Sequence, residues 1–184
     1  MKRSVLTLFF LLCLALVANA QYDKDVFNFR GRAALADGKY SEAIGHFNVL
    51  ARLDSTDCWT FFYRGIAKYN LGDLRGAQAD FNTSVRLNPV FTNGYHYRAI
   101  TLSRSGKYDE ALKDLEKALE LRPGLNGLYF SRGVTYFLAQ QFDKAVSDFD
   151  RYIRKEPKDP SAFLNRGASY LFLGDTTKAL EDYN

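Results

Sequence analysis

The chain has 184 residues and a nearly balanced charge, with 25 Lys and Arg against 21 Asp and Glu. Loss of Lys2 and Arg3 with an N-terminal leader lowers the formal net charge from +4 to about +2. A charge this small gives no basis for binding nucleic acid, so we expect no nucleic-acid partner.

Residues 1–20 have the layout of a secretory signal peptide. Two basic residues at 2–3 precede an apolar run over 5–17, and the sequence Ala-Asn-Ala at 18–20 offers a small-x-small cleavage site. The run is shorter than the about 20 residues needed to cross a bilayer, which disfavours the alternative of a membrane anchor. We therefore expect an exported protein of residues 21–184, periplasmic or secreted, or in the endoplasmic reticulum lumen of a eukaryotic host.

The mature chain keeps a single cysteine, Cys58, so it cannot form an internal disulfide. In an oxidising compartment its fold must therefore rely on packing. A disulfide from Cys58 to another chain is an open alternative, because a leftover cysteine in an exported protein can pair between molecules.

A 34-residue period runs through almost the whole mature chain. An arginine recurs with this period, an aromatic residue stands three positions before it, and a glycine (once an alanine) follows it. A fixed period of this length indicates stacked supersecondary units that are each too small to bury a core alone. The clearest series are Ala43, Ala77, Ala111, Ala145 and Ala179, and Arg30, Arg64, Arg98, Arg132 and Arg166.

The unit over 92–125 shows how one period folds. Apolar residues at i, i+4 and i+7 predict a first helix over 92–104, and Gly106 suits the left-handed turn that ends it. Acidic residues at 109–110 favour the start of a second helix, and Pro123 ends it. The period therefore predicts a helix-turn-helix hairpin.

The pattern resembles the tetratricopeptide repeat (TPR) family, whose units carry a bulky aromatic, a small residue, an alanine, a large apolar residue and a closing proline. The second unit supplies Phe61, Gly65, Ala77, Phe81 and Pro89. Ser55 replaces the proline in the first unit, and Gln140 replaces the turn glycine in the fourth. The resemblance implies an all-α, right-handed superhelical solenoid of antiparallel helix hairpins, with about four and a half to five repeats. The repeats are 24–57, 58–91, 92–125, 126–159 and the incomplete 160–184.

The recurring arginines have two interpretations, an anion-binding ladder or structural ion pairs. An aspartate follows four of them by sixteen residues, at Asp80, Asp114, Asp148 and Asp182, whereas His46 takes that position after Arg30. We predict ion pairs within each hairpin, with the arginine stems packed on neighbouring rings. Arg30, which lacks an acid, is the best candidate for another role.

In the TPR family the first helices line a concave groove, so the resemblance implies a groove for a protein or peptide ligand. The positions that would face this groove are rich in aromatic residues in the second and fourth units. An open alternative is that single rings only pack between adjacent first helices. The candidate groove residues are Asn28, Arg32, Trp59, Phe62, Ile66, Tyr69, Asn70, His96, Ile100, Arg104, Phe130, Val134 and Phe137.

No motif of a catalyst is present. His46 and His96 have no second histidine or cysteine at metal-ligand spacing, and no phosphate-binding loop or nucleophile motif occurs. We therefore expect no catalytic residues, no cofactor and no metal. Membrane association is expected only through a partner, and the sequence does not set the oligomeric state.

The fifth unit stops early in its second helix, at Asn184, without the polar cap that solenoids need. We expect that the chain is a fragment; the alternative is that this end docks on a partner or another copy. The leading hypothesis for function is an exported, non-catalytic scaffold that binds a peptide or protein. The alternatives are the N-terminal docking region of a longer exported enzyme or envelope assembly factor and, third, a carrier of a hydrophobic small molecule.

Overall fold

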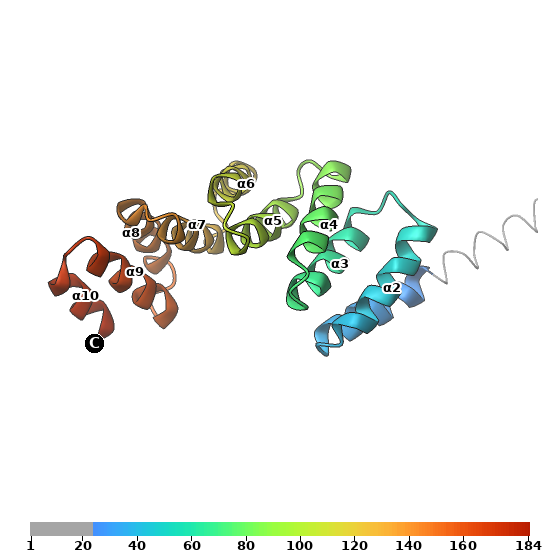
Figure 1. Cartoon of the computed structure of the whole chain (residues 1–184), viewed down its shortest axis with the longest axis horizontal. Coiled ribbons are helices and arrows are strands. Elements are labelled where there is room, and N and C mark those ends of the chain that lie inside the picture. Colours follow the sequence, from blue (N-terminus) through green and yellow to red (C-terminus); the bar gives the residue numbers. More distant parts are fainter. Residues whose placement is uncertain (1–23) are drawn as a thin grey trace, which may run out of the picture. The chain divides into compact units, whose positions relative to one another are not determined.

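The computed structural model describes residues 24–184, so the expected signal peptide and its cleavage site lie outside the described residues. This part of the chain is helical, with no strand in it, and the predicted all-α class is confirmed. No helix in it combines the length and apolar character of a membrane span. A helix over 24–36 is followed by α2 (Tyr40–Leu53), α3 (Cys58–Asn70), α4 (Leu74–Leu87), α5 (Thr92–Arg104), α6 (Tyr108–Leu121), α7 (Gly127–Leu138), α8 (Phe142–Ile153), α9 (Pro160–Phe172) and α10 (Thr176–Tyr183) (Figure 1).

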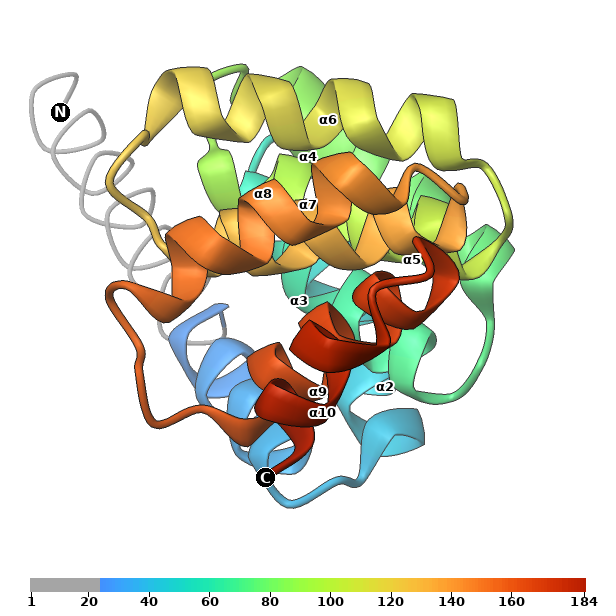
Figure 2. The same ribbon diagram turned by 90° about the vertical axis from the view of Figure 1, so that its left-hand side faces the viewer.

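Consecutive helices form antiparallel hairpins, each closed by a short turn (Figures 1 and 2). The turn after α5 contains Gly106 with φ of 76°, a left-handed conformation that glycine adopts without a steric penalty. The turn after α7 has the same conformation at Gln140, with φ of 60°. The left-handed turn predicted at Gly106 is confirmed, and the fourth hairpin keeps this turn without its glycine.

Side-chain caps define the start of two first helices. The Asp57 carboxylate accepts hydrogen bonds from the backbone N–H groups of Trp59 and Thr60 at the start of α3. Asp159 accepts from Ser161 N–H at the start of α9, where Pro160 occupies the first turn. Both caps satisfy backbone donors that have no partner within the helix.

Small residues let a large ring fill the space between the two helices of a hairpin. The five periodic alanines have no exposed surface. Four residues after the alanine, the ring of Phe81 presses on Gly65, where an added Cβ would lie 2.7 Å from the ring. Gly31, Gly133 and Gly167 lie in the same way against Phe47, Phe149 and Tyr183. An aromatic side chain, and not a second backbone, therefore makes the close contact at these glycines.

The chain divides into two compact units. Unit 1 ends at Leu87 and contains the helix over 24–36 with α2, α3 and α4; unit 2 runs from Asn88 to Asn184 and contains α5–α10. One core cluster in unit 1 joins Ala34, Ala43, Phe47, Leu50 and Ala67. A second cluster, in unit 2, joins Ala99, Leu102, Ala111, Leu115, Ala118, Leu119, Leu128 and Tyr129.

Candidate functional site

The recurring arginines bind the carboxylates that follow them by sixteen residues, across the two helices of one hairpin. Arg64 Nε donates to Asp80 Oδ2 at 2.9 Å, and Arg64 Nη2 donates to Asp80 Oδ1 at 2.6 Å. The same two-point geometry joins Arg98 to Asp114, Arg132 to Asp148 and Arg166 to Asp182. The four predicted ion pairs are therefore present, and they link the helices of each hairpin.

Each of these arginines also lies against the aromatic ring three residues before it. The guanidinium carbons of Arg64 and Arg132 are 5.2 Å and 5.6 Å from the ring centroids of Phe61 and Tyr129. Hydrogen bonding to Asp148 raises the pKa of Arg132, so its charge is fixed at any ordinary pH. The predicted packing of the arginines on neighbouring rings is present. The ring contact and the ion pair together hold each guanidinium group within its own hairpin.

A further hydrogen bond from two of these arginines, Arg64 and Arg166, joins neighbouring hairpins. Arg64 Nη1 donates to Asn48 Oδ1 on α2 at 2.9 Å, and Arg166 Nη1 donates to Asp150 Oδ1 on α8 at 2.6 Å. In both cases the acceptor lies sixteen residues before the arginine, on the second helix of the preceding hairpin. These arginines therefore hold the repeats together and are not an anion-binding ladder.

Arg30 differs from the other periodic arginines. Its side chain is exposed, and it forms no ion pair within residues 24–184. His46, at the position of the missing acid, lies with Nε2 3.7 Å from Glu42 Oε1. The expectation that Arg30 has a role other than hairpin pairing is consistent with this arrangement.

In unit 1 the structure brings several candidate groove residues to the surface of the first helices. Asn28 and Arg32 are exposed and line a hollow of about 470 Å³ together with Asp25, Phe29 and Ala33. The Arg32 guanidinium lies 5.3 Å from the centre of the Tyr63 ring.

The other candidates of unit 1 lie on α3 and differ in exposure. Trp59 is exposed and stacks on Tyr63. Ile66 and Tyr69 are half-buried, and Asn70 is exposed with its side-chain amide donating to Ile66 O. Phe62 is 4% exposed and contacts Phe81 of α4, so it is a core residue and offers no open surface.

In unit 2 the first helices α5 and α7 meet through polar contacts. His96 Nε2 lies 2.7 Å from Ser131 Oγ, and Ser103 Oγ lies 2.8 Å from Thr135 Oγ1. Burial lowers the pKa of His96 to about 4, so the imidazole is neutral at pH 7 and makes one hydrogen bond with the serine hydroxyl, in which the tautomer decides the donor. His96 therefore acts as a contact between two first helices.

The remaining candidates of unit 2 are half-buried, except Arg104, which is exposed. The Phe130 ring packs on Phe149 and Tyr152 of α8, and Phe137 packs on Phe142 and Phe172. Ile100 and Val134 are the other half-buried members. Phe137, which contacts Phe172 of the next first helix α9, fits the alternative of rings packed between adjacent first helices, whereas Phe130 packs on the second helix of its own hairpin.

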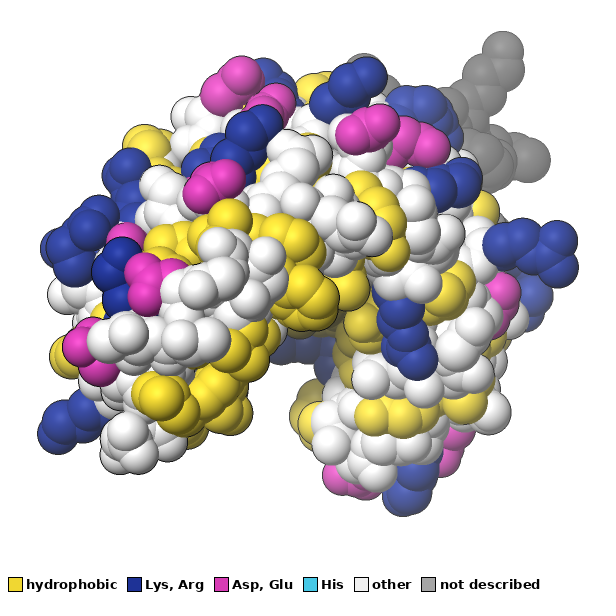
Figure 3. Space-filling model, turned by 60° about the vertical axis from the view of Figure 1, so that its left-hand side comes forward, with side chains coloured by type: hydrophobic (Ala, Val, Ile, Leu, Met, Phe, Trp, Pro, Cys, Tyr) yellow, Lys and Arg dark blue, Asp and Glu magenta, His cyan; other side chains and the backbone are white. Residues whose placement is uncertain are grey.

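Three further exposed apolar side chains of the first helices lie on α9, which the candidate groove residues did not include. Phe172 is 66% exposed, Leu164 55% and Leu171 48%. In Figure 3, hydrophobic side chains form a broad area on one side of unit 2, with charged side chains mainly beyond it. The groove positions of the 34-residue period fall on Leu164, Leu171 and Phe172 in the fifth unit, so the period alone points to these residues.

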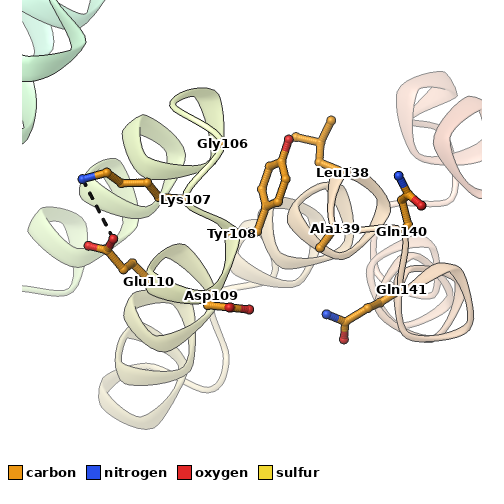
Figure 4. A pocket seen from close by; sticks show the side chains of 9 residues that line it. All are labelled: Gly106, Lys107, Tyr108, Asp109, Glu110, Leu138, Ala139, Gln140 and Gln141. Atoms are coloured by element: carbon orange, nitrogen blue, oxygen red, sulfur yellow. Dashed lines mark ion pairs between the residues drawn. The ribbon is translucent and has the colours of Figure 1, made fainter.

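A second surface feature of unit 2 lies at its turns. A pocket of about 400 Å³ is bordered by residues 106–110 at the α5–α6 turn and by residues 138–141 at the α7–α8 turn (Figure 4). The Tyr108 side chain extends toward Leu138, and the left-handed Gln140 lies on the opposite side of the pocket (Figure 4). Its lining is mixed in polarity, and no His, Cys, Asp or Glu group suited to a metal ion occurs within residues 24–184.

The arrangement of hairpins matches known proteins. Tetratricopeptide repeat family models match residues 92–125 and 130–184. A crystal structure of MamA protein shares 18% sequence identity with a TM-score of 0.78, covering 88% of this chain and 88% of that chain. A structure of MamA from residue 41 to the end, from Desulfovibrio magneticus RS-1, shares 22% identity with a TM-score of 0.81, covering 88% and 91%. No curated protein sequence matches the chain.

These findings agree with the hairpins, turns and core described above. Identities this low establish a shared fold and nothing finer. The predicted solenoid class is confirmed at the level of the fold, and the family models cover the third repeat and most of the fourth and fifth. The chain contains tetratricopeptide repeats.

Proposed function

We propose that the protein is an exported scaffold without chemistry of its own, which binds an apolar segment of a peptide or protein on its first helices. The observation that carries this proposal is the composition of α3, α5, α7 and α9, which contain no Asp or Glu. Their arginines at the periodic position are already bound by carboxylates of the second helices. What these helices offer to a ligand is therefore mainly apolar surface.

The exposed side chains on these helices suit such a ligand. Trp59 in unit 1 and Leu164, Leu171 and Phe172 in unit 2 are each more than two-fifths exposed. Aromatic and large aliphatic residues supply most of the binding free energy at protein interfaces when a partner covers them. A partner rich in Lys or Arg would find no carboxylate on these four helices, so we propose a ligand with apolar anchors and few basic residues.

Export to the periplasm, the cell exterior or the endoplasmic reticulum lumen is part of the proposal. It is supported by the basic, apolar and small-residue regions of residues 1–20. The mass of the native protein recovered from its own cells tests it. The mass of a chain whose first residue is Gln21 would support export. A mass that still includes residues 1–20 would contradict it.

The ligand proposal is tested with a random peptide library displayed on phage and selected against the chain that begins at Gln21. We expect enriched peptides with aromatic or branched apolar residues and few Lys or Arg. Leu164→Ala combined with Leu171→Ala, both on α9, should weaken binding of an enriched peptide by about tenfold or more, because truncation of two interface anchors typically removes over 1 kcal/mol each.

The matched control is Leu53→Ala, which truncates a similarly exposed leucine at the end of the second helix α2. This variant should bind the peptide as the unaltered chain does. Circular dichroism should show equal helix content in all variants. Equal peptide binding by the Leu164→Ala and Leu171→Ala double variant would contradict the assignment to the first helices.

A further inference from the structure

A pocket in unit 2 is bordered by three cationic side chains. It has a volume of about 610 Å³ and lies between the α6–α7 loop and the end of α8, which Figure 2 shows at the same edge of unit 2. Gly124 and Tyr129 belong to one wall, and the other wall carries Arg151, Arg154 and Lys155. None of the lining residues is a candidate groove residue, so the pocket is a separate feature of the molecule.

The charges of these three residues are not neutralised within the chain. Four periodic arginines are each bound by an aspartate, whereas Arg151, Arg154 and Lys155 form no ion pair within residues 24–184. All three are exposed, so a ligand can reach them. Glu156 is the one acidic residue of the lining, and it pairs with none of them. The pocket therefore holds an excess of positive charge.

Contacts between the two walls fix the shape of the pocket. The Arg151 guanidinium carbon lies 4.1 Å from the centroid of the Tyr129 ring, and the Tyr129 hydroxyl donates to Pro123 O at 3.2 Å. Asn126 Nδ2 donates to Tyr152 O on α8 at 3.1 Å, which ties the loop to the helix. A guanidinium stacked on a ring keeps its N–H donors at its edges. The pocket and its first cation are therefore in place before a ligand binds.

Basic residues at the end of a helix often serve only to bind its last carbonyl groups. At the end of α8 other donors already bind these groups. Tyr152 O accepts from two backbone N–H groups and from Asn126 Nδ2, and Asp150 O accepts from a backbone N–H group. The side chains of Arg151, Arg154 and Lys155 are therefore available to a ligand.

Two residues of the pocket depart from the 34-residue period. Lys155 occupies a position at which the first three units have Leu53, Leu87 and Leu121. Gly124 occupies a position at which the other complete units have Thr56, Val90 and Lys158. A Cβ added at Gly124 would meet no atom within 4 Å, so the glycine leaves open space beside the cations. The hairpin design requires neither residue, which favours a role in binding.

We propose that this pocket binds a phosphate monoester group, with Arg151 and Arg154 donating to its oxygens and Lys155 supplying a third positive charge. Such a group carries close to two negative charges at pH 7, and arginine donates to phosphate oxygens through two parallel N–H groups. An acidic peptide spreads its charges along an extended chain, whereas the three cations here border one pocket. The group belongs to a soluble ester or to a lipid headgroup. This inference does not depend on the proposed ligand binding by the first helices.

The test uses the chain that begins at Gln21 and two phosphate probes at low ionic strength. Isothermal titration measures binding of glycerol 3-phosphate, and flotation measures binding to phosphatidylcholine vesicles that contain or lack phosphatidic acid. Binding of glycerol 3-phosphate assigns the pocket to a soluble ester. Binding only to vesicles that contain phosphatidic acid assigns it to a lipid headgroup.

Two substitutions to glutamine should change the affinity for the bound probe in opposite directions. Arg154→Gln combined with Lys155→Gln should weaken binding by about tenfold or more, because two charge-assisted contacts are lost. Glu156→Gln should strengthen binding, because it removes the one like charge from the lining.

The matched control is Arg75→Gln combined with Arg86→Gln, which removes two exposed arginines of α4 and lowers the net charge by the same amount. It should bind the probe as the unaltered chain does, and circular dichroism should show that all variants are folded. Failure of both probes to bind would overturn the inference, and so would an equal loss of binding in the control. Stronger binding of a hexaglutamate peptide than of either phosphate probe would also overturn it and assign the pocket to an acidic segment.

Discussion

Gln140 is the one non-glycine residue among those described with a positive φ, and it sits where the other hairpins use glycine. The left-handed conformation brings the side chain of an L-residue close to the following carbonyl, which costs about 1 kcal/mol or more. Replacing Gln140 with glycine should therefore raise the free energy of unfolding by about 1 kcal/mol. Urea unfolding followed by circular dichroism measures the change.

The reverse substitution at the neighbouring hairpin is the control for this prediction. Gly106 has φ of 76°, so Gly106→Ala introduces the strain that Gln140→Gly removes and should lower the stability. If both variants shift the stability in the same direction, backbone strain is not the property being measured. Equal stability of Gln140→Gly and the unaltered chain would mean that a contact of the Gln140 side chain compensates for the strain.

His96 makes the stability of the protein dependent on pH. Burial lowers its pKa from 6.5 to about 4 in the folded state. Between these values the unfolded chain binds a proton at His96 that the folded chain does not, so stability rises with pH across this range and falls as the pH drops through it. At about 1.4 kcal/mol per pH unit, the loss on going from pH 7 to pH 4 is about 3 kcal/mol.

Substitution His96→Gln isolates this contribution, because glutamine can still hydrogen-bond to Ser131 without titrating. The difference in unfolding free energy between pH 7 and pH 5 should be smaller in this variant than in the unaltered chain. Urea unfolding at the two pH values provides the measurement. An unchanged difference would assign the acid sensitivity to other groups.

At the level of helices, the Arg–Asp pairs hold each hairpin closed. Asp114 on α6 is buried and binds Arg98 of α5 through two hydrogen bonds. Asp114→Asn leaves the arginine charge without its counterion, which should lower the free energy of unfolding by about 3 kcal/mol. The melting temperature should fall accordingly, while the affinity for a selected peptide stays unchanged.

The exposed pair of Lys117 and Glu120 on the same helix is the matched control. Solvent screens this pair, so Glu120→Gln should leave the melting temperature nearly unchanged. If Asp114→Asn has no larger effect than Glu120→Gln, the periodic arginines are not structural and return to the list of ligand contacts.

The sequence predicted the hairpins well because their signals are local. The turn at Gly106, the end of α6 before Pro123 and the pairing of Arg98 with Asp114 all follow from residues within one period. The candidate groove was harder to predict because exposure depends on neighbouring helices. Phe62 and Phe130 occupy equivalent positions, yet Phe62 is buried against Phe81, whereas Phe130 is only half covered.

At the level of the molecule, the chain divides into two compact units that the 34-residue period does not indicate. The register continues unbroken between Ala77 and Ala111, although the compact units meet at Leu87 and Asn88. The constant 34-residue spacing reflects the contacts within each hairpin. The grouping of hairpins into units depends instead on the packing between hairpins. The period likewise places Leu164, Leu171 and Phe172 of α9 at groove positions, whereas the exposed fractions of these side chains depend on the packing within unit 2.

The distribution of charge over the whole molecule determines how ligand binding should respond to salt. The acids lie outside α3, α5, α7 and α9, and the periodic arginines of these helices are each neutralised by an aspartate. Binding of an apolar segment to these helices should then rest on buried area, which salt does not screen. A tenfold rise in ionic strength should change the dissociation constant of a selected peptide by less than about threefold. Isothermal titration at the two ionic strengths tests this, and a steep loss of affinity with salt would instead place the ligand on exposed charges such as Arg32 and Arg104.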